Sequence, residues 1–172
     1  MLLTLASAAL GQWKVSPGTM MTRWGKQVTP QNAWQEYPRP QFRREENWKN
    51  LNGLWQYGIN QKSQIPQVYQ GDILVPFPVE SALSGVQRLL MPDETLWYRR
   101  VFQHQTPMAH RTHLHFEAVD YECTVYLNGI RIGSHRGSSD PFKFDITDSL
   151  QSGENEWVVS VMDPTAPSQT LG

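Results

Sequence analysis

The stretch Ala118-Val-Asp-Tyr-Glu-Cys-Thr-Val-Tyr-Leu-Asn-Gly-Ile-Arg-Ile-Gly133 decides the fold class of this chain. Cys123, Val125 and Leu127 occupy every second position, which puts them on one face of a β-strand. The pair Asn128-Gly129 follows at once, and a second short alternating run comes after it. An Asn-Gly pair between two such runs favours a type I′ turn, because both central residues need positive φ. The stretch therefore predicts an antiparallel β-hairpin.

The segments on either side of this hairpin carry the same kind of signal. Apolar residues alternate with polar ones in short runs, and clusters rich in Gly, Pro, Asn and Ser separate the runs. About seven short strands at this spacing, with little helix, predict an all-β jelly-roll β-sandwich; an immunoglobulin-like sandwich is the alternative. The expected strands cover residues 54–59, 72–75, 97–102, 113–118, 123–127, 130–132, 142–146 and 157–161, with a turn at 152–155.

Length and charge limit the possible functions. The chain has 172 residues, enough for one domain with a full core but too few for a second domain the size of a (β/α)8 barrel. It carries 15 Lys and Arg against 16 Asp and Glu, so no broad basic field favours nucleic acid or an anionic membrane surface. Cys123 is the only cysteine, which excludes a disulfide within the chain.

The N-terminal third reads differently from the rest. Residues 1–12 are apolar and contain Ala6-Ser7-Ala8, which resembles the end of a secretory signal peptide, although no basic leading region precedes it. This predicts a signal remnant and a secreted or periplasmic protein; a disordered apolar terminus is the alternative. Residues 13–47 are rich in Pro, Gln and Trp and predict an extended arm whose Trp side chains dock on a folded body. Residues 48–172 then form the jelly roll.

Catalytic chemistry finds little support among the residues. Asp120 and Glu122 are two positions apart, so on a strand their carboxyls point in parallel instead of converging on one glycosidic bond. His113 and His115 share the polar face of a strand, but no third ligand has the spacing of a zinc site. No nucleophile elbow and no dinucleotide or phosphate loop occurs. The sequence thus predicts no catalytic residue, no metal and no cofactor.

Two loops contain the candidate contact residues. Residues 77–85 leave a strand with polar and apolar groups side by side, and they include Glu80 and Ser81. Residues 134–140 are polar and rich in Ser and Gly, and they include His135 and Asp140. Loops often carry function on such scaffolds, so these four residues are candidates for contact with a carbohydrate or with a neighbouring domain. A purely solvated loop remains the simpler interpretation of each.

Several short segments, each weak alone, follow one another in a specific order. They are Trp34-Gln-Glu-Tyr-Pro-Arg-Pro-Gln41, Leu51-Asn-Gly-Leu-Trp55, Leu74-Val-Pro-Phe-Pro-Val-Glu-Ser-Ala-Leu-Ser-Gly-Val86, Pro92-Asp-Glu-Thr-Leu-Trp-Tyr-Arg-Arg100 and Val125-Tyr-Leu-Asn-Gly129. In this order they resemble the N-terminal sugar-binding domain of glycoside hydrolase family 2, the family of β-galactosidases, β-glucuronidases and β-mannosidases. The resemblance implies a galactose-binding-like jelly roll that precedes an immunoglobulin-like domain and a (β/α)8 barrel.

The resemblance also implies where catalysis resides. The acid/base and nucleophile glutamates of the family belong to the barrel, and no residue of this chain matches them. The stretch containing Gly and Trp that usually follows Asp163-Pro-Thr165 and leads to a closing strand is absent as well. We therefore expect a fragment or a truncated product that lacks its closing strand. Its expected partners are a β-glycoside carbohydrate and the missing domains.

Three functions are compatible with these features. The first is a non-catalytic N-terminal domain of a family 2 glycosidase, which supports hydrolysis only within the full-length enzyme. The second is a free-standing carbohydrate-binding module, which requires an exposed aromatic platform and a few polar groups. The third is a purely structural domain, in which every Trp is buried and the surface contacts only other domains.

Overall fold

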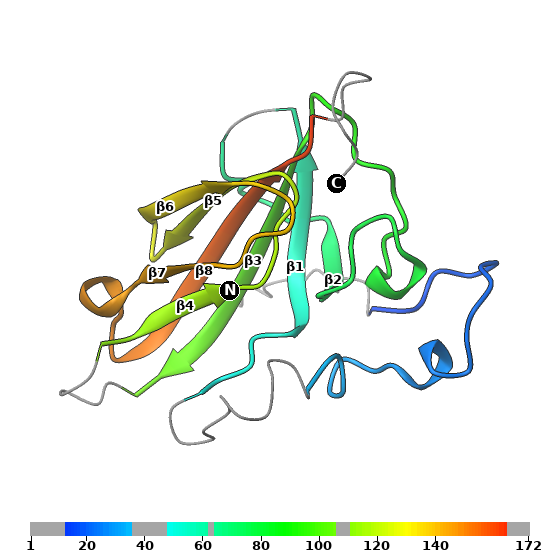
Figure 1. The fold of residues 1–172 in the computed structure, drawn as a ribbon, viewed down its shortest axis with the longest axis horizontal. Coiled ribbons are helices and arrows are strands. Elements are labelled where there is room, and N and C mark those ends of the chain that lie inside the picture. The colour runs from blue at the N-terminus through cyan, green and yellow to red at the C-terminus, as the bar shows by residue number, and fades with distance from the viewer. Residues whose placement is uncertain (1–12, 36–47, 62–63, 106–110, 165–172) are drawn as a thin grey trace, which may run out of the picture. The chain divides into compact units, whose positions relative to one another are not determined.

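The computed structural model describes residues 13–35, 48–61, 64–105 and 111–164, so the signal-like residues 1–12 lie outside the described part (Figure 1). The chain divides into two compact units, one of residues 1–54 and 70–88 and the other of residues 55–69 and 89–172. None of the described segments is an α-helix, and none could span a bilayer as a helix. The strands are β1 (Gly53–Asn60), β2 (Gly71–Val75), β3 (Thr95–His104), β4 (His113–Phe116), β5 (Glu122–Leu127), β6 (Ile130–Arg136), β7 (Phe142–Asp145) and β8 (Gly153–Met162).

The second unit contains the larger sheet. Its strands lie in the order β1-β3-β8-β5-β6, and every adjacent pair is antiparallel (Figure 1). The longest pairing joins β3 to β8, from Leu96 opposite Val161 to His104 opposite Gly153. Val158 is buried as well as its neighbours Trp157 and Val159, so the expected alternation disappears there. Val158 lies between Arg99 of β3 and Tyr126 of β5, whose long side chains flank it on the same face of the sheet.

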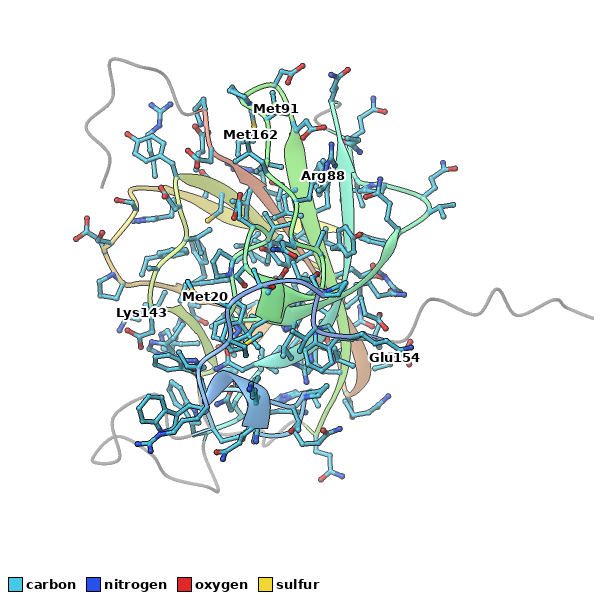
Figure 2. The ribbon with its side chains drawn as sticks, turned by 90° about the vertical axis from the view of Figure 1, so that its right-hand side faces the viewer. Met20, Arg88, Met91, Lys143, Glu154 and Met162 are labelled. Atoms are coloured by element: carbon cyan, nitrogen blue, oxygen red, sulfur yellow. The ribbon has the colours of Figure 1, made fainter. Side chains whose placement is uncertain are left out.

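A two-stranded ribbon of β4 and β7 packs against this sheet in the same unit. Along β7 the side chains of Phe142 and Phe144 are half-buried, whereas Lys143 lies at the surface (Figure 2). The ring of Phe144 covers Gly133 on β6 so closely that a Cβ atom at Gly133 would clash with it. Two sheets with a shared core form the predicted all-β sandwich, so the expected fold class is confirmed.

The core comes from the residues that the alternation predicts. On β5 the side chains of Cys123, Val125 and Leu127 are all buried, while the histidines of β4 flank a buried Leu114 and are themselves exposed. Paired across the strands, these apolar positions fill the space between the sheets. The other buried apolar side chains of this unit are Trp55, Ile59, Leu90, Leu96, Trp97, Ile146, Trp157, Val158, Val159 and Val161.

The predicted hairpin is present between β5 and β6. Asn128 has φ 52° and Gly129 has φ 77°, the positive values that a type I′ turn needs. The Asn128 side chain accepts a hydrogen bond from the Glu156 backbone N–H at 2.9 Å and donates one to the Ser149 carbonyl at 3.1 Å. The turn is therefore tied to the neighbouring strand β8 as well as to its own hairpin.

The predicted turn at residues 152–155 is wrong at its C-terminal end. Strand β8 already begins at Gly153, and Asn155 is buried on it with 1% of its surface exposed. Its side chain accepts hydrogen bonds from Gln151 N and Asn128 Nδ2, both at 2.9 Å. It also donates to the carbonyls of Gln151 and Gly153. The polar character of residues 152–155 suggested a solvated turn, but the four hydrogen bonds of the Asn155 side chain take the place of hydrogen bonds to water.

The first unit contains the described part of the arm. The Trp13 indole N–H donates to the carbonyls of Leu83 and Ser84, at 3.2 and 3.1 Å, so this side chain docks as predicted. Trp24 and Trp34 are more exposed, with 64% and 50% of their surfaces accessible. One face of the Trp24 ring contacts the Arg23 guanidinium, whose carbon lies 4.3 Å from the ring centroid.

The free energy of unfolding at low pH is expected to depend on Asp145, the last residue of β7. Hydrogen bonds from the Thr147 hydroxyl and backbone N–H, and then from Arg111, hold the pKa of this carboxyl well below its usual range. A depressed pKa in the folded state means that stability is present above the unfolded pKa of about 3.9 and is lost as pH falls below it. Asp145→Asn should therefore flatten the stability profile below about pH 4, measured by urea unfolding at several pH values.

Asp148→Asn is the matched control for this prediction, because it makes the same chemical change at an exposed side chain three residues away. Equal acid profiles for the two variants would contradict the role assigned to Asp145.

Candidate functional site

The structure places Glu80 and Ser81 in the first unit, in the turn that leads into a short 3-10 helix, Ala82–Ser84. Ser81 is the N-cap of this helix, and its side-chain oxygen accepts a hydrogen bond from Ser84 N at 3.1 Å. The Ser84 hydroxyl is buried and donates to the Val79 carbonyl at 3.1 Å. Glu80 is exposed. The Ser81 side chain thus has a local structural role, and Glu80 is the accessible one of the two.

His135 lies on β6, opposite Cys123 of β5. Its imidazole stacks on the ring of Phe142, with centroids 4.0 Å apart and planes 13° from parallel. Phe142 in turn stacks on Phe116, at 4.8 Å and 12°. The three rings form a continuous stack from β6 across β7 to β4. The imidazole plane is therefore held by packing before any polar contact is considered.

The polar edge of this imidazole faces the loop between β6 and β7. The Nε2 atom of His135 is buried and has no hydrogen-bond partner among the described residues. Gly137 has φ 140°, a conformation that residues with a side chain rarely adopt. A Cβ atom at Gly137 would lie 3.4 Å from Nε2 of His135 and 3.6 Å from Oδ2 of Asp140. The structure therefore brings His135 and Asp140 together around Gly137.

Neighbouring residues hold this loop in place. The Gly137 backbone N–H donates to the Tyr121 carbonyl at 2.8 Å. The Arg136 guanidinium forms an ion pair with Glu122 at 3.1 Å, and its carbon lies 5.6 Å from the centroid of the Tyr121 ring. Gly137 and Tyr121 were not among the residues predicted for the site. A glycine between two polar runs was the only local signal, and it does not reveal which side chains meet above it.

Other reactive groups of the described residues do not assemble into a catalytic or metal centre. Burial raises the pKa of Cys123 to about 11, so this thiol is a poor nucleophile. Burial, followed by the charges of Lys143 and His113, lowers the pKa of His115. No group of three or more His, Cys, Asp or Glu side chains in the described ranges is placed to hold a metal ion.

Comparison with known proteins places the chain in a family. The family model described as "Glycosyl hydrolases family 2, sugar binding domain" matches residues 67–171, which is more than half of the chain. The chain belongs to glycosyl hydrolase family 2. The matched range includes both candidate loops and nearly all of the second unit from β3 onward. The resemblance seen in the ordered sequence segments is confirmed by this match.

The curated relatives are distant in sequence and match different shares of the chain. β-Glucuronidase of Sus scrofa is 26% identical over 160 residues, which cover 83% of this chain and 24% of that protein. β-Galactosidase of Thermoanaerobacter pseudethanolicus is 36% identical over 66 residues, which cover 38% of this chain and 9% of that protein. The chain thus spans only a small part of the length of these relatives.

Solved structures of the family show the same fold. A β-glucuronidase of an uncultured Clostridium species matches with a TM-score of 0.54 and 25% identity, over 66% of this chain and 22% of that one. A β-D-mannosidase of Dictyoglomus thermophilum matches with a TM-score of 0.53 and 26% identity, over 66% of this chain and 15% of that one. The predicted jelly roll is therefore the fold of the family's sugar-binding domain.

Proposed function

We propose that this chain acts as the non-catalytic, carbohydrate-contacting domain of a β-glycosidase, and that O-glycosyl hydrolysis requires further domains. The observation that carries the proposal is the match of residues 67–171 to the sugar-binding domain of family 2. The relatives are named β-glucuronidase and β-galactosidase, and the matched part is a small fraction of each. The activity of the whole enzyme is therefore assigned to segments beyond this domain.

The carboxylates of the second unit support a non-catalytic role. A retaining glycosidase uses two carboxyl groups about 5 to 5.5 Å apart on either side of the scissile bond. Glu122 is instead paired with Arg136, and Asp145 forms an ion pair with Arg111. Both acids thus already serve local contacts within the sandwich.

The proposed partners are a β-glycoside and the other domains of the enzyme, an immunoglobulin-like domain and a (β/α)8 barrel. The proposed location is secreted or periplasmic. It is supported by the small and apolar residues of 1–12, which have the composition of the end of a signal peptide. Detection of the protein in the medium or periplasm of its source cells would test the location directly.

The catalytic part of the proposal is tested with chromogenic 4-nitrophenyl β-galactoside, β-glucuronide and β-mannoside. We expect no hydrolysis by the 172-residue chain above the buffer rate with any of the three. Glu80→Gln and Asp120→Asn are the matched control variants. Glu80→Gln removes the exposed acid of the loop at residues 77–85, and Asp120→Asn removes the acid two residues before Glu122 in the sequence. Turnover by the chain that either substitution abolishes would overturn the non-catalytic assignment.

An independent glycan-binding role is favoured over a purely structural one by the arm. The structural interpretation requires buried Trp side chains throughout, whereas Trp24 is 64% exposed. An exposed indole offers a flat apolar face of the kind that packs against sugar rings. Acrylamide quenching of Trp fluorescence, compared between the wild type and Trp24→Phe, measures this exposure. If an added glycoside protects Trp24 from quenching, the exposed face of the indole binds sugar. Equal quenching of the wild type and Trp24→Phe would favour the purely structural interpretation.

A further inference from the structure

The buried edge of His135 is the feature of the second unit that the family assignment leaves unexplained. Buried nitrogen atoms in folded proteins almost always have a hydrogen-bond partner, because an unpaired one has lost its water without compensation. Nε2 of His135 is buried and unpartnered among the described residues. The ring cannot easily turn away, since it is stacked at 4.0 Å on Phe142. This nitrogen is therefore held in place and available to a hydrogen-bond partner.

Asp140 is the group placed to supply that partner. Its carboxylate lies across the space that the missing side chain of Gly137 leaves open, with Oδ2 3.6 Å and Nε2 of His135 3.4 Å from the same point. Asp140 is exposed, and among the described residues no hydrogen bond or ion pair engages its carboxylate. The two groups are not hydrogen-bonded in the structure, so contact between them requires a rotation of the exposed Asp140 side chain toward Nε2.

We propose that His135 positions Asp140 as the carbohydrate-contacting carboxylate of this domain, an inference that rests on the proposed glycan-binding function. In this arrangement Nε2 of His135 carries the ring proton and donates a hydrogen bond to Oδ2 of Asp140. The other oxygen, Oδ1, then faces solvent in a defined direction and accepts a hydrogen bond from a ligand hydroxyl. Gly137 is part of this arrangement, because a Cβ atom there would lie 3.4 Å from Nε2 of His135 and 3.6 Å from Oδ2 of Asp140.

The chemistry of this contact sets the class of ligand. A carboxylate only accepts hydrogen bonds, so it binds hydroxyl donors, and it repels a second carboxylate at the same place. The cation next to His135 in sequence, Arg136, is already paired with Glu122. The site therefore takes a neutral sugar ring through a hydroxyl and disfavours the carboxylate of a uronic acid at this position.

The contact is tested by titrating the full chain with methyl β-D-galactopyranoside and methyl β-D-glucuronide, with NMR chemical-shift changes as the readout. We expect the neutral glycoside to bind more tightly, and Asp140→Asn to weaken its binding by about tenfold, since a charge-assisted hydrogen bond is lost. Asp148→Asn removes an equally exposed acid outside the loop and should leave the affinity unchanged. Equal affinities for the wild type and Asp140→Asn, or tighter binding of the glucuronide, would overturn the inference.

The positioning role has its own readout, the tautomer of His135 observed through its ring nitrogen chemical shifts. We expect the proton on Nε2 in the wild type and a shift of the population toward Nδ1 in Asp140→Ala, which removes the acceptor. His135→Phe keeps a flat ring for the stack on Phe142 but deletes Nε2, and it should weaken glycoside binding several-fold while the chain remains folded. An unchanged tautomer in Asp140→Ala would refute the positioning of Asp140 by His135.

The two hypotheses fail in different ways. If neither glycoside binds the wild-type chain, the proposed glycan-binding function fails and the inference fails with it. If a glycoside binds but neither Asp140 nor His135 affects the affinity, the proposed function stands and this inference alone is refuted.

Discussion

Replacing Trp157 with alanine is expected to lower the free energy of unfolding by about 3–5 kcal/mol, the usual effect of truncating a large buried aromatic side chain. Trp157 lies on the central strand β8 with 1% of its surface exposed, and its ring stacks on Phe102 at 5.7 Å and 8°. The substitution removes the apolar contacts of the buried ring, including its stack on Phe102, and leaves a cavity that strands paired on both sides cannot close. Urea unfolding followed by circular dichroism measures the loss.

Trp157→Phe separates packing from polarity at the same position. The indole Nε1 of Trp157 is buried without a hydrogen-bond partner among the described residues, so phenylalanine removes an unsatisfied donor while keeping a ring against Phe102. We expect this variant to lose much less stability than the alanine variant. A loss as large as that of Trp157→Ala would show that ring size, and not the contact with Phe102, decides the stability.

Replacing Asn155 with alanine is the second substitution expected to have a large effect, a loss of about 2–4 kcal/mol in unfolding free energy. The side chain is 1% exposed and makes four hydrogen bonds, with Asn128 Nδ2, Gln151 N, and the carbonyls of Gln151 and Gly153. Alanine removes all four bonds at once and leaves the partly buried partner groups without the amide. The same urea measurement applies, and unfolding of β8 should also release the turn at Asn128.

Gln151→Ala is the control for this prediction. Gln151 contributes only its backbone to these bonds and is exposed, so its side chain is dispensable in this account. We expect a change within about 0.5 kcal/mol for it. Similar losses for the two variants would mean that the buried network around Asn155 does not stabilise the sandwich.

The fold was predictable from the sequence where local and tertiary preferences agree. Cys123, Val125 and Leu127 alternate on a strand that is buried on one face only, so the pattern of the sequence is the pattern of burial. The turn at Asn128-Gly129 was predictable because positive φ is a local property of these residue types. The signal weakens on β8, where Val158 is buried as well as its neighbours, since the long side chains of Arg99 and Tyr126 flank it on the adjacent strands.

The candidate site residues also divide into those whose contacts follow from local sequence and those whose contacts follow from tertiary packing. Ser81 was predicted as a contact residue, and the structure shows that its side chain also caps a short 3-10 helix through Ser84 N, a bond set by local sequence. His135 and Asp140 were predicted only as members of one polar loop. That they approach each other follows from the ring stack on Phe142 and from the φ of 140° at Gly137. Neither of these features has a sequence signature.

By itself the sequence determined that this protein is an all-β sandwich with the ordered segments of glycosyl hydrolase family 2. Strand periodicity, turn residues and family motifs are each carried by a short stretch of sequence, and together they indicate one fold. Only the tertiary structure decided that Asn155 is a buried network residue and that His135 faces Asp140 across Gly137. Asn155 is buried where β8 meets the Asn128 turn of the preceding hairpin, and the His135 ring is held by its stack on Phe142 of the neighbouring strand β7. Which polar side chain becomes buried, and which one meets it, is a property of that packing and not of the residue types.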